Sequence, residues 1–200
     1  MSCNTSNVSD LVRDQIDKIR QISTDKGVLD LACGRGRNGL YLLRQDIPVT
    51  FVDVDTQALT SIRSALNNKL DISRGNSEDL AAQRPAAQFC QLDLEAGFLT
   101  DGVAAKPLGG RVFDTVLVFN YLHRPIMPWL KETVKPGGLI LYETFTYAQA
   151  AIGRPSNRGF LLAPGELREL FDNWQILYYF EGEFTSPKRA KACLVARKPQ

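Results

Sequence analysis

The chain is poor in the residues from which metal and disulfide sites are built. Histidine occurs once, at His123, which excludes a histidine-rich metal centre. The four cysteines (Cys3, Cys33, Cys90 and Cys193) are widely spaced and form no CxxC pair, so neither a zinc ribbon nor a redox dithiol is indicated. Scattered thiols are typical of a reducing compartment, and we therefore expect a cytoplasmic protein without a metal site.

Long apolar runs and an excess of charge of one sign are also absent. No stretch approaches ~18 apolar residues, so we expect no membrane-spanning segment. The polar first 20 residues have no apolar core of the kind found in a secretory signal. Lys and Arg total 24 and Asp and Glu total 22, and a net charge of +2 argues against a dedicated nucleic-acid binder.

From residue 27 onward, short apolar runs alternate with segments of helical spacing. The sequence predicts helices at 37–45, 56–70, 124–134 and 163–171. It predicts strands at 27–33, 48–54, 87–94, 113–122, 138–146, 174–184 and 191–198. Alternation of this kind indicates an α/β fold of three layers, with a doubly wound, mostly parallel sheet of seven strands. The turn expected at 185–190 makes the last strand antiparallel.

The remaining segments determine the expected domain organisation. Apolar residues recur at helical spacing from Val8 to Ile22, so residues 1–26 predict a helix that packs on the main body or caps a site. Residues 27–200 are expected to form one domain. We expect irregular chain at 71–86 and 95–111, and a long loop at 147–163 of a kind that often carries function.

A glycine-rich turn between the first strand and the first helix is the main candidate binding element. Gly34 and Gly36 allow the backbone to approach a ligand, and the amides at the start of the helix point into the same space. Together with Gly39 they match the GxGxxG pattern, and Asp53 could take the ribose hydroxyls of a dinucleotide. An NAD(P)-dependent oxidoreductase is therefore one open alternative.

Acidic residues at the strand ends favour a different ligand. Asp30, Asp53 and Asp93 lie in or after three successive strands, whose carboxyl ends meet at one edge of such a sheet. A carboxylate beside the loop would repel a pyrophosphate, but it would attract a sulfonium or an ammonium group. These acids therefore favour a ligand with a cationic centre, although Asp93 could instead cap a turn.

Four stretches resemble class I S-adenosylmethionine-dependent methyltransferases. LDLACGRG (29–36) resembles motif I of that family, although Ala32 stands where many members have a glycine. FVDVD (51–55), QLDLE (91–95) and LKETVKPGGLILYETF (130–145) are similar to its second, third and fifth strands. CGRGRNGLYL (33–42) is similar to the tellurite-resistance and thiopurine methyltransferase-like branch, and the resemblance covers nearly all of 27–198.

The resemblance implies S-adenosylmethionine as the cofactor and a Rossmann-like fold. It implies that Asp30 lies near the methionine ammonium, that Asp53 holds the ribose hydroxyls and that Asp93 meets the adenine amine. The full set of implied cofactor-binding residues is Asp30, Ala32, Cys33, Gly34, Gly36, Arg37, Asp53, Val54, Asp93, Leu94, Asn120 and Leu122.

Candidate residues for the methyl acceptor follow the fourth and fifth strands. His123 could be a general base because imidazole titrates near neutral pH, and a capping or packing histidine is the alternative. Glu143 could hold a cationic or hydroxyl-bearing acceptor, or form a structural salt bridge. The catalytic candidates are His123, Tyr121 and Glu143, and the substrate candidates are Arg124, Thr144, Arg154 and Arg158.

The expected function is in-line transfer of a methyl group from S-adenosylmethionine to a small-molecule acceptor. The Asp/Asn-Pro-Pro-aromatic motif of many base-amine methyltransferases is missing, since residues 120–123 read NYLH. The basic residues of 188–191 are expected in a solvated turn, with RNA contact as the alternative. An RNA methyltransferase and a non-catalytic cofactor-binding module therefore remain open beside the oxidoreductase.

Overall fold

The computed structural model describes residues 8–72, 86–96, 99–100, 103–104 and 107–200. The chain forms two compact units, one ending at Asp93 and one beginning at Leu94, and each is described by itself. No helix in the described ranges is both long and apolar enough to cross a bilayer.

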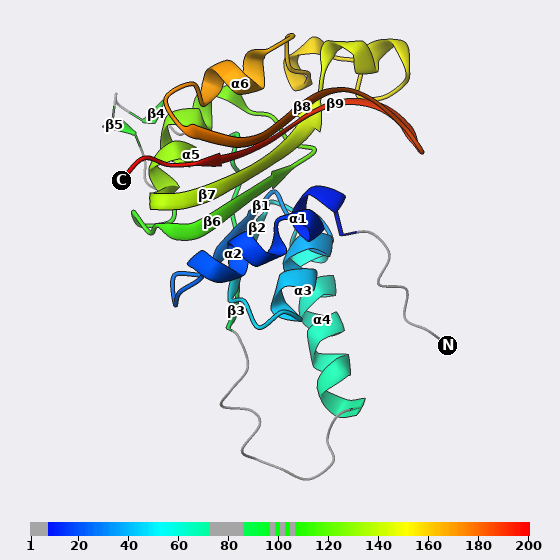
Figure 1. The fold of residues 1–200 in the computed structure, drawn as a ribbon. Coiled ribbons are helices and arrows are strands. Elements are labelled where there is room, and N and C mark those ends of the chain that lie inside the picture. The colour runs from blue at the N-terminus through cyan, green and yellow to red at the C-terminus, as the bar shows by residue number, and fades with distance from the viewer. Residues whose placement is uncertain (1–7, 73–85, 97–98, 101–102, 105–106) are drawn as a thin grey trace. The chain divides into compact units, whose positions relative to one another are not determined.

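The first unit is a parallel three-stranded sheet with its helices (Figure 1). Its elements are α1 (Asp10–Asp14), α2 (Ile16–Ile22), β1 (Val28–Leu31), α3 (Arg37–Leu43), β2 (Val49–Asp53), α4 (Thr56–Ile72) and β3 (Ala87–Gln91). Strand β2 pairs in parallel with β1 on one side and with β3 on the other. All four residues of β1 are buried, as expected for a strand of a parallel sheet that is covered on both faces.

The predicted N-terminal helix is two helices in the structure, α1 and α2. They are separated at Gln15, whose φ of −102° and ψ of 7° depart from helical values. The Ser9 N–H donates to Asn38 Oδ1 in α3 at 2.9 Å, and Asn38 is almost fully buried. The start of α1 is therefore bonded to α3, whereas packing of the whole segment on the main body or over a site stays a prediction.

The second unit contains the longer strands and most of the loops. Its elements are β4 (Leu99–Thr100), β5 (Val103–Ala104), β6 (Phe113–Phe119), η2 (Arg124–Ile126), α5 (Met127–Thr133), β7 (Val134–Phe145), η3 (Tyr147–Ala151), η4 (Arg158–Phe160), α6 (Glu166–Leu170), β8 (Gln175–Thr185) and β9 (Lys188–Arg197). Strands β6 and β7 are parallel, and β9 lies antiparallel between β7 and β8. The seven strands, in the order β3-β2-β1 in the first unit and β6-β7-β9-β8 in the second, confirm the predicted mixed sheet with its antiparallel last strand.

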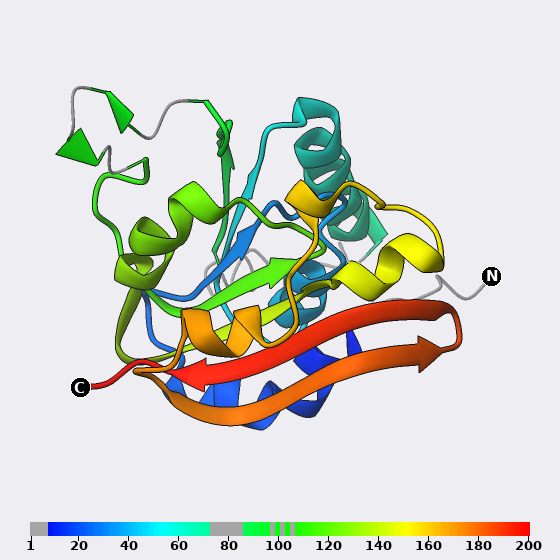
Figure 2. The ribbon, with the colours of Figure 1, turned by 90° about the horizontal axis from the view of Figure 1, so that it is seen from above.

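The predicted turn between the last two strands is present, but it is shorter than the predicted range 185–190. The β8–β9 ladder continues until Thr185 pairs with Lys188, so only Ser186 and Pro187 form the turn of the long ribbon seen in Figure 2. Backbone pairing in a hairpin does not require apolar side chains. The polar residues at the strand ends therefore gave no sequence signal of a strand. Lys191 therefore lies inside β9 and not in a solvated turn.

Other boundaries differ in smaller ways. Strand β7 begins at residue 134 and not at 138, with an irregular register near its start. The predicted loop 147–163 contains the short helices η3 and η4. Of the segments expected to be irregular, residues 71–72 belong to α4 and 73–85 lie outside the described residues. Segment 95–111 contains β4 and β5, and its remaining described residues have no regular structure.

Candidate functional site

The chain turns sharply between β1 and α3 in the first unit. Gly34 and Gly36 have φ values of 53° and 68°, in the left-handed region that glycine adopts without strain. The Cys33 N–H donates to Val52 O at 3.0 Å, and the Gly36 N–H donates to Cys33 O at 2.9 Å. The turn is thereby fixed to the neighbouring strand β2.

The two glycines of this turn face different surroundings. A Cβ on Gly36 would lie 2.6 Å from the Ile62 side chain, so packing requires glycine there. A Cβ on Gly34 would meet nothing within 4 Å, and this residue is exposed. Ala32 adopts a φ of 50°, a backbone conformation uncommon for alanine. The turn therefore presents an exposed backbone at Gly34, as close ligand approach requires.

Asp30 is a buried carboxylate beneath the turn. Its Oδ2 accepts a hydrogen bond from the Gly39 N–H at 2.9 Å, in the first turn of α3. Burial raises the pKa of Asp30 to about 7, against the opposing effects of that hydrogen bond and of the Arg37 charge. A Cβ on Gly39 would lie 2.8 Å from Oδ2 and 2.3 Å from the Phe51 ring, so the glycine admits the carboxylate.

Asp53 ends β2 and binds the turn from the other side. Its Oδ2 accepts from the Gly34 N–H at 2.7 Å, and its Oδ1 accepts from the Asp55 N–H at 2.9 Å. Each carboxylate oxygen can accept more than one hydrogen bond, so both could also receive hydroxyl groups. Val54 follows Asp53, and 56% of its surface is exposed. An exposed apolar side chain therefore lies next to the Asp53 carboxylate in the chain.

The other cofactor candidates of the first unit vary in exposure. Asp93 and Arg37 are exposed, and the Cys33 thiol is half-buried. Burial, and to a lesser degree the charge of Asp30, raises the pKa of this thiol far above its ordinary value. Cys33 is therefore protonated near neutral pH, which is compatible with lining a site and not with acting as a thiolate nucleophile.

In the second unit, the segment Asn120–Arg124 carries most of the candidates. Asn120 is exposed, has a φ of 56°, and its N–H donates to Glu143 O at 2.8 Å. The Tyr121 carbonyl accepts from Tyr142 Oη at 3.0 Å, and Leu122 is buried, as is Leu94. His123 is half-buried, and within the described ranges its imidazole has no recorded hydrogen bond, so both hypotheses for it stay open.

Glu143 forms the salt bridge that was one of its two predicted roles. Its Oε1 lies 2.7 Å from Lys191 Nζ, which also donates to Asn120 Oδ1 at 2.8 Å. Sequence analysis assigned Lys191 no role at the site, because it grouped the residue with the basic residues of 188–191 although its predicted strand began there. The signal was a glutamate inside an apolar strand, which needs a cationic partner on a neighbouring strand.

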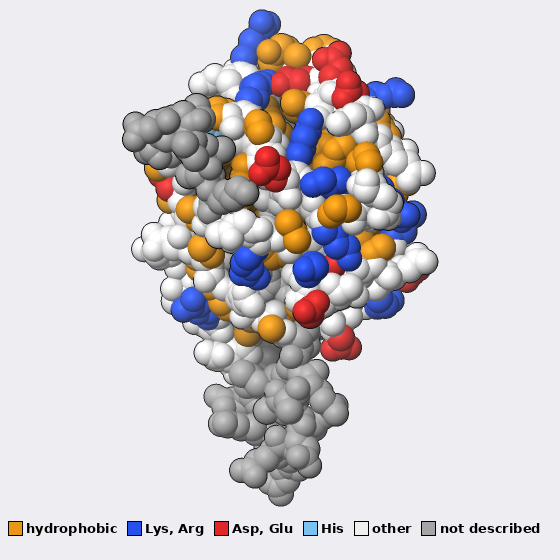
Figure 3. Space-filling view, turned by 90° about the vertical axis from the view of Figure 1, so that its left-hand side faces the viewer, with side chains coloured by type: hydrophobic (Ala, Val, Ile, Leu, Met, Phe, Trp, Pro, Cys, Tyr) orange, Lys and Arg blue, Asp and Glu red, His pale blue; other side chains and the backbone are white. Residues whose placement is uncertain are grey.

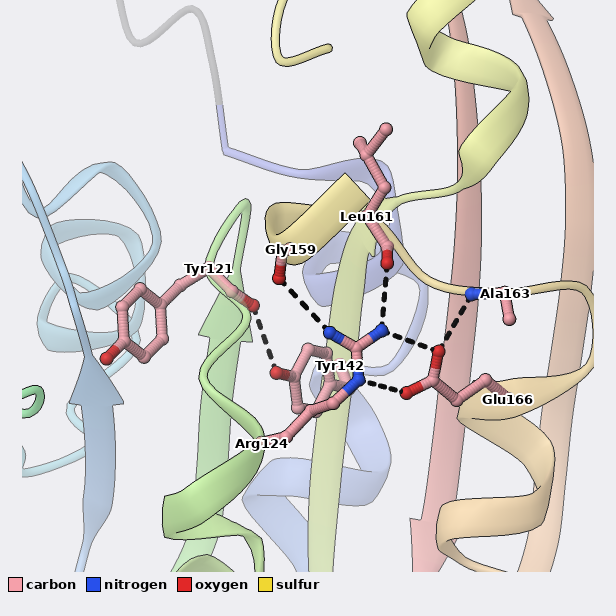
Figure 4. A network of polar contacts seen from close by, with 7 residues as sticks. All are labelled: Tyr121, Arg124, Tyr142, Gly159, Leu161, Ala163 and Glu166. Atoms are coloured by element: carbon pink, nitrogen blue, oxygen red, sulfur yellow. Dashed lines mark hydrogen bonds and ion pairs between the residues drawn. The ribbon is translucent and has the colours of Figure 1, made fainter. Parts of the chain in front are cut away.

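Arg124 links the segment after β6 to the loop at 147–163 and to helix α6 (Figure 4). Its Nε and Nη2 bind both carboxylate oxygens of Glu166 at 2.5 and 2.8 Å. Its Nη1 donates to Gly159 O at 3.1 Å, and Nη2 also donates to Leu161 O at 2.9 Å. A bidentate pair with two added carbonyl contacts is a clamp on the loop, so contact of Arg124 with a substrate stays a prediction.

The remaining substrate candidates do not share one environment. Thr144 is buried in β7, whereas Arg154 and Arg158 are exposed in the loop. The Arg158 guanidinium stacks over the Tyr147 ring, 5.0 Å from its centroid. In the part of the chain that the structure describes, no group of three or more His, Cys, Asp or Glu side chains could hold a metal ion.

Comparison with known families supports the predicted resemblance. The family model of the tellurite resistance protein TehB matches residues 3–89, which is less than half of the chain. This match and the structural neighbours below confirm the resemblance to class I methyltransferases of the tellurite-resistance branch. No curated protein matches the chain.

Solved structures show the same fold at low sequence identity. TehB from Haemophilus influenzae is 21% identical with a TM-score of 0.67, and the match covers 98% of this chain but only 64% of TehB. A SAM-dependent methyltransferase from Methanosarcina mazei is 17% identical with a TM-score of 0.62, covering 91% of this chain and 97% of that one. Magnesium protoporphyrin IX methyltransferase from Synechocystis, solved with bound SAH, is 13% identical with a TM-score of 0.61, covering 94% and 80%.

The raised pKa of Asp30 predicts a pH-dependent stability. Between about pH 4 and 7 the folded chain binds a proton at Asp30 that the unfolded chain has lost, so this carboxyl makes the free energy of unfolding decrease as pH rises. Asp30→Asn should remove that slope, measured by urea unfolding from pH 4 to 8. Asp17→Asn, at an exposed carboxyl, should leave the slope unchanged. An unchanged slope in Asp30→Asn would show that Asp30 is ionised across this range.

The Arg124–Glu166 clamp predicts the opposite pH behaviour. Hydrogen bonding by Arg124 holds the pKa of Glu166 below its ordinary value, so this pair stabilises the fold at neutral pH and stops doing so as pH falls through that lowered pKa. Glu166→Gln should lower the free energy of unfolding by about 1–3 kcal/mol at pH 7, and by less in acid. Glu169→Gln, on the exposed side of α6, should have little effect; equal losses in both variants would contradict the clamp.

Proposed function

We propose that this chain is an S-adenosylmethionine-dependent methyltransferase that transfers a methyl group to a small-molecule acceptor. The main support is the arrangement around the glycine turn of the first unit. One acid, Asp30, is buried beneath the turn, and a second, Asp53, binds the exposed Gly34 amide. Several solved structures of the same fold are methyltransferases, two of them with bound S-adenosylhomocysteine (SAH).

The proposed cofactor has chemical groups that match these residues. Asp53 would accept the two ribose hydroxyls while keeping its bonds to the backbone amides. The exposed Val54 side chain would contact the apolar face of the adenine ring. The carboxylate of Asp30 would favour the cationic ammonium of the methionine moiety. Asn120 and Leu122 stay predicted cofactor-binding residues, on the family resemblance alone.

An NAD(P)-dependent oxidoreductase is less well supported by the same geometry. A dinucleotide fold uses the amides at the start of its first helix to bind a pyrophosphate. In α3 the Gly39 amide is already bonded to the Asp30 carboxylate. A second anion at this position would be repelled whenever Asp30 is ionised. This bond is the specific observation that favours a cationic ligand over a pyrophosphate.

The charge distribution of the chain favours a small molecule over RNA as the methyl acceptor. On the face drawn in Figure 3, Lys and Arg side chains are interspersed with acidic and hydrophobic ones. RNA binding typically uses a basic stripe or patch, and the net charge of +2 provides no overall attraction. Methyl transfer is an in-line displacement at the sulfonium, so the protein chiefly positions the nucleophile and excludes water.

His123 is proposed as the general base for acceptors that are protonated at neutral pH. It directly precedes Arg124, whose clamp fixes the start of η2, so its backbone is held in place. Tyr121 and Glu143 are proposed to support the acceptor, although the Glu143 carboxylate is already paired with Lys191. Arg154 and Arg158 remain candidates for an anionic acceptor, because both are exposed on one loop.

Replacement of Asp53 tests the proposed cofactor. Asp53→Asn should weaken SAH binding by at least about tenfold, since an amide offers one acceptor oxygen where the carboxylate offers two. Isothermal titration calorimetry with SAH measures this, with NADH as the second ligand. Asp55→Ser keeps a side-chain acceptor for the Gln57 amide at the start of α4, so it should retain SAH affinity. Tight NADH binding without SAH binding would replace the proposed function by the oxidoreductase.

Replacement of His123 tests the proposed base. His123→Gln should lower methyl transfer by about a hundredfold or more while SAH affinity stays unchanged. The assay uses methyl-labelled S-adenosylmethionine with a metabolite extract, and a parallel reaction contains total RNA. Unchanged turnover would assign His123 to packing, and label found in RNA would favour the RNA methyltransferase.

A further inference from the structure

Exposed aromatic side chains gather on strand β8 of the second unit. Among the described residues, the exposed large apolar or aromatic side chains are Val54, Phe160, Tyr178, Phe180 and Phe184. The last three belong to β8. Burial of an aromatic side chain contributes a large favourable free energy, so a cluster of exposed rings on one strand indicates an interaction surface.

The three rings lie on one face of the sheet. The β9 partners of Tyr178, Phe180 and Phe184 are separated by even numbers of residues, and alternate residues of a strand share a face. The Phe180 and Phe184 rings meet edge to face, with their centroids 5.2 Å apart. A Cβ on Gly182 would lie 3.0 Å from the Phe180 ring, so the glycine between them leaves room for this contact.

The backbone of β8 is also available for pairing. In the second unit β8 follows β9 at the end of the strand order, and no described strand pairs with its other side. Figure 2 shows it as the outer strand of the β8–β9 ribbon. An edge strand offers N–H and C=O groups to another strand. The register of β8 is irregular only between Ile176 and Tyr178, so the edge is regular from Tyr178 to Thr185.

The acidic side chains of β8 are bound within their own chain. Charged residues commonly prevent an edge strand from pairing with another molecule. Here the Glu181 carboxylate accepts hydrogen bonds from Tyr179 Oη and from the Gly165 N–H. The Glu183 carboxylate lies 3.4 Å from Lys188 Nζ. These contacts lessen the repulsion that either acid exerts on an incoming strand.

We propose that β8 pairs antiparallel with β8 of a second copy of this chain, in a two-fold dimer whose axis passes at Phe180. A two-fold axis places the same surface of both copies in contact. Phe180 is the midpoint of Gln175–Thr185, so an axis there gives the longest overlap of the two strands. The two Phe180 side chains would then lie opposite each other. The inference does not depend on the proposed function.

The charges of β8 favour the same register. With the axis at Phe180, Glu181 lies opposite Tyr179 of the second copy, and no acid lies opposite an acid. An axis at Glu181 would place the two Glu181 side chains opposite each other, and an axis at Gly182 would place Glu181 opposite Glu183. Like charges in directly opposed positions destabilise a strand pair. This agreement of charge and overlap favours a second copy over an unrelated partner.

A charge at the proposed axis tests the dimer. Phe180→Lys would bring two ammonium groups together, so it should weaken dimerisation by about a hundredfold. Phe160→Lys, at an exposed ring outside β8, should leave dimerisation unchanged. Sedimentation equilibrium of the full chain across about a hundredfold range of concentration measures the dissociation constant. Thermal unfolding followed by circular dichroism verifies that each variant folds.

Mixing two variants separates charge repulsion from damage to the fold. Phe180→Glu alone should also be monomeric, but its mixture with Phe180→Lys should form dimers because opposite charges then meet at the axis. A wild type that stays monomeric at every concentration would overturn the inference. A dimer that persists in Phe180→Lys, or a mixture that stays monomeric, would do so as well.

Cross-linking tests the register. In Phe180→Cys the two introduced thiols would lie next to each other, so a short thiol-reactive cross-linker should join the two chains. In Phe184→Cys they would lie ~26 Å apart along the strands, beyond the reach of that reagent. Both variants keep the four native cysteines, so their difference reports the introduced thiol. Equal cross-linking of both variants, or none in Phe180→Cys, would overturn the proposed pairing.

Discussion

The candidate cofactor site depends on a carboxylate that is held where water cannot reach it. Asp30 is in the centre of β1, and the Gly39 amide is its recorded hydrogen-bond donor. Keeping a charged carboxylate there costs free energy, which its raised pKa expresses. Ionisable groups whose pKa is strongly shifted by burial are concentrated at functional sites. The burial of Asp30 is thus more easily explained by a ligand than by stability.

A second polar arrangement organises the other unit. The segment that follows β6 is bonded at Asn120, at Tyr121 and at Arg124, by side chains or backbone from β7, β9, η4 and α6. These partners come from positions more than 20 residues away along the chain. The three bonded residues are held by different partners, so each contact fixes a different part of the segment. A segment held at three points is suited to presenting functional groups in fixed orientations.

The fold was largely predictable because periodicity and motif spacing are local signals. Apolar runs at 27–33, 48–54 and 113–122 each became a strand, and the glycine turn lies where the motif placed it. The hairpin turn was predicted to be too long because the ends of β8 and β9 pair through the backbone and carry polar residues. The break between α1 and α2 at Gln15 was not predicted either, because no proline or glycine at that position indicates it.

The sequence by itself determined the order of the strands and helices, the glycine turn and the acids at the strand ends, because these follow from residue type and spacing. Only the tertiary structure decided which charges meet. Lys191 and Glu143, or Arg124 and Glu166, are each more than 40 residues apart, and no local pattern relates them. Strand register and loop packing bring them within hydrogen-bonding distance. Side-chain pairing across strands depends on that register, which long-range packing determines.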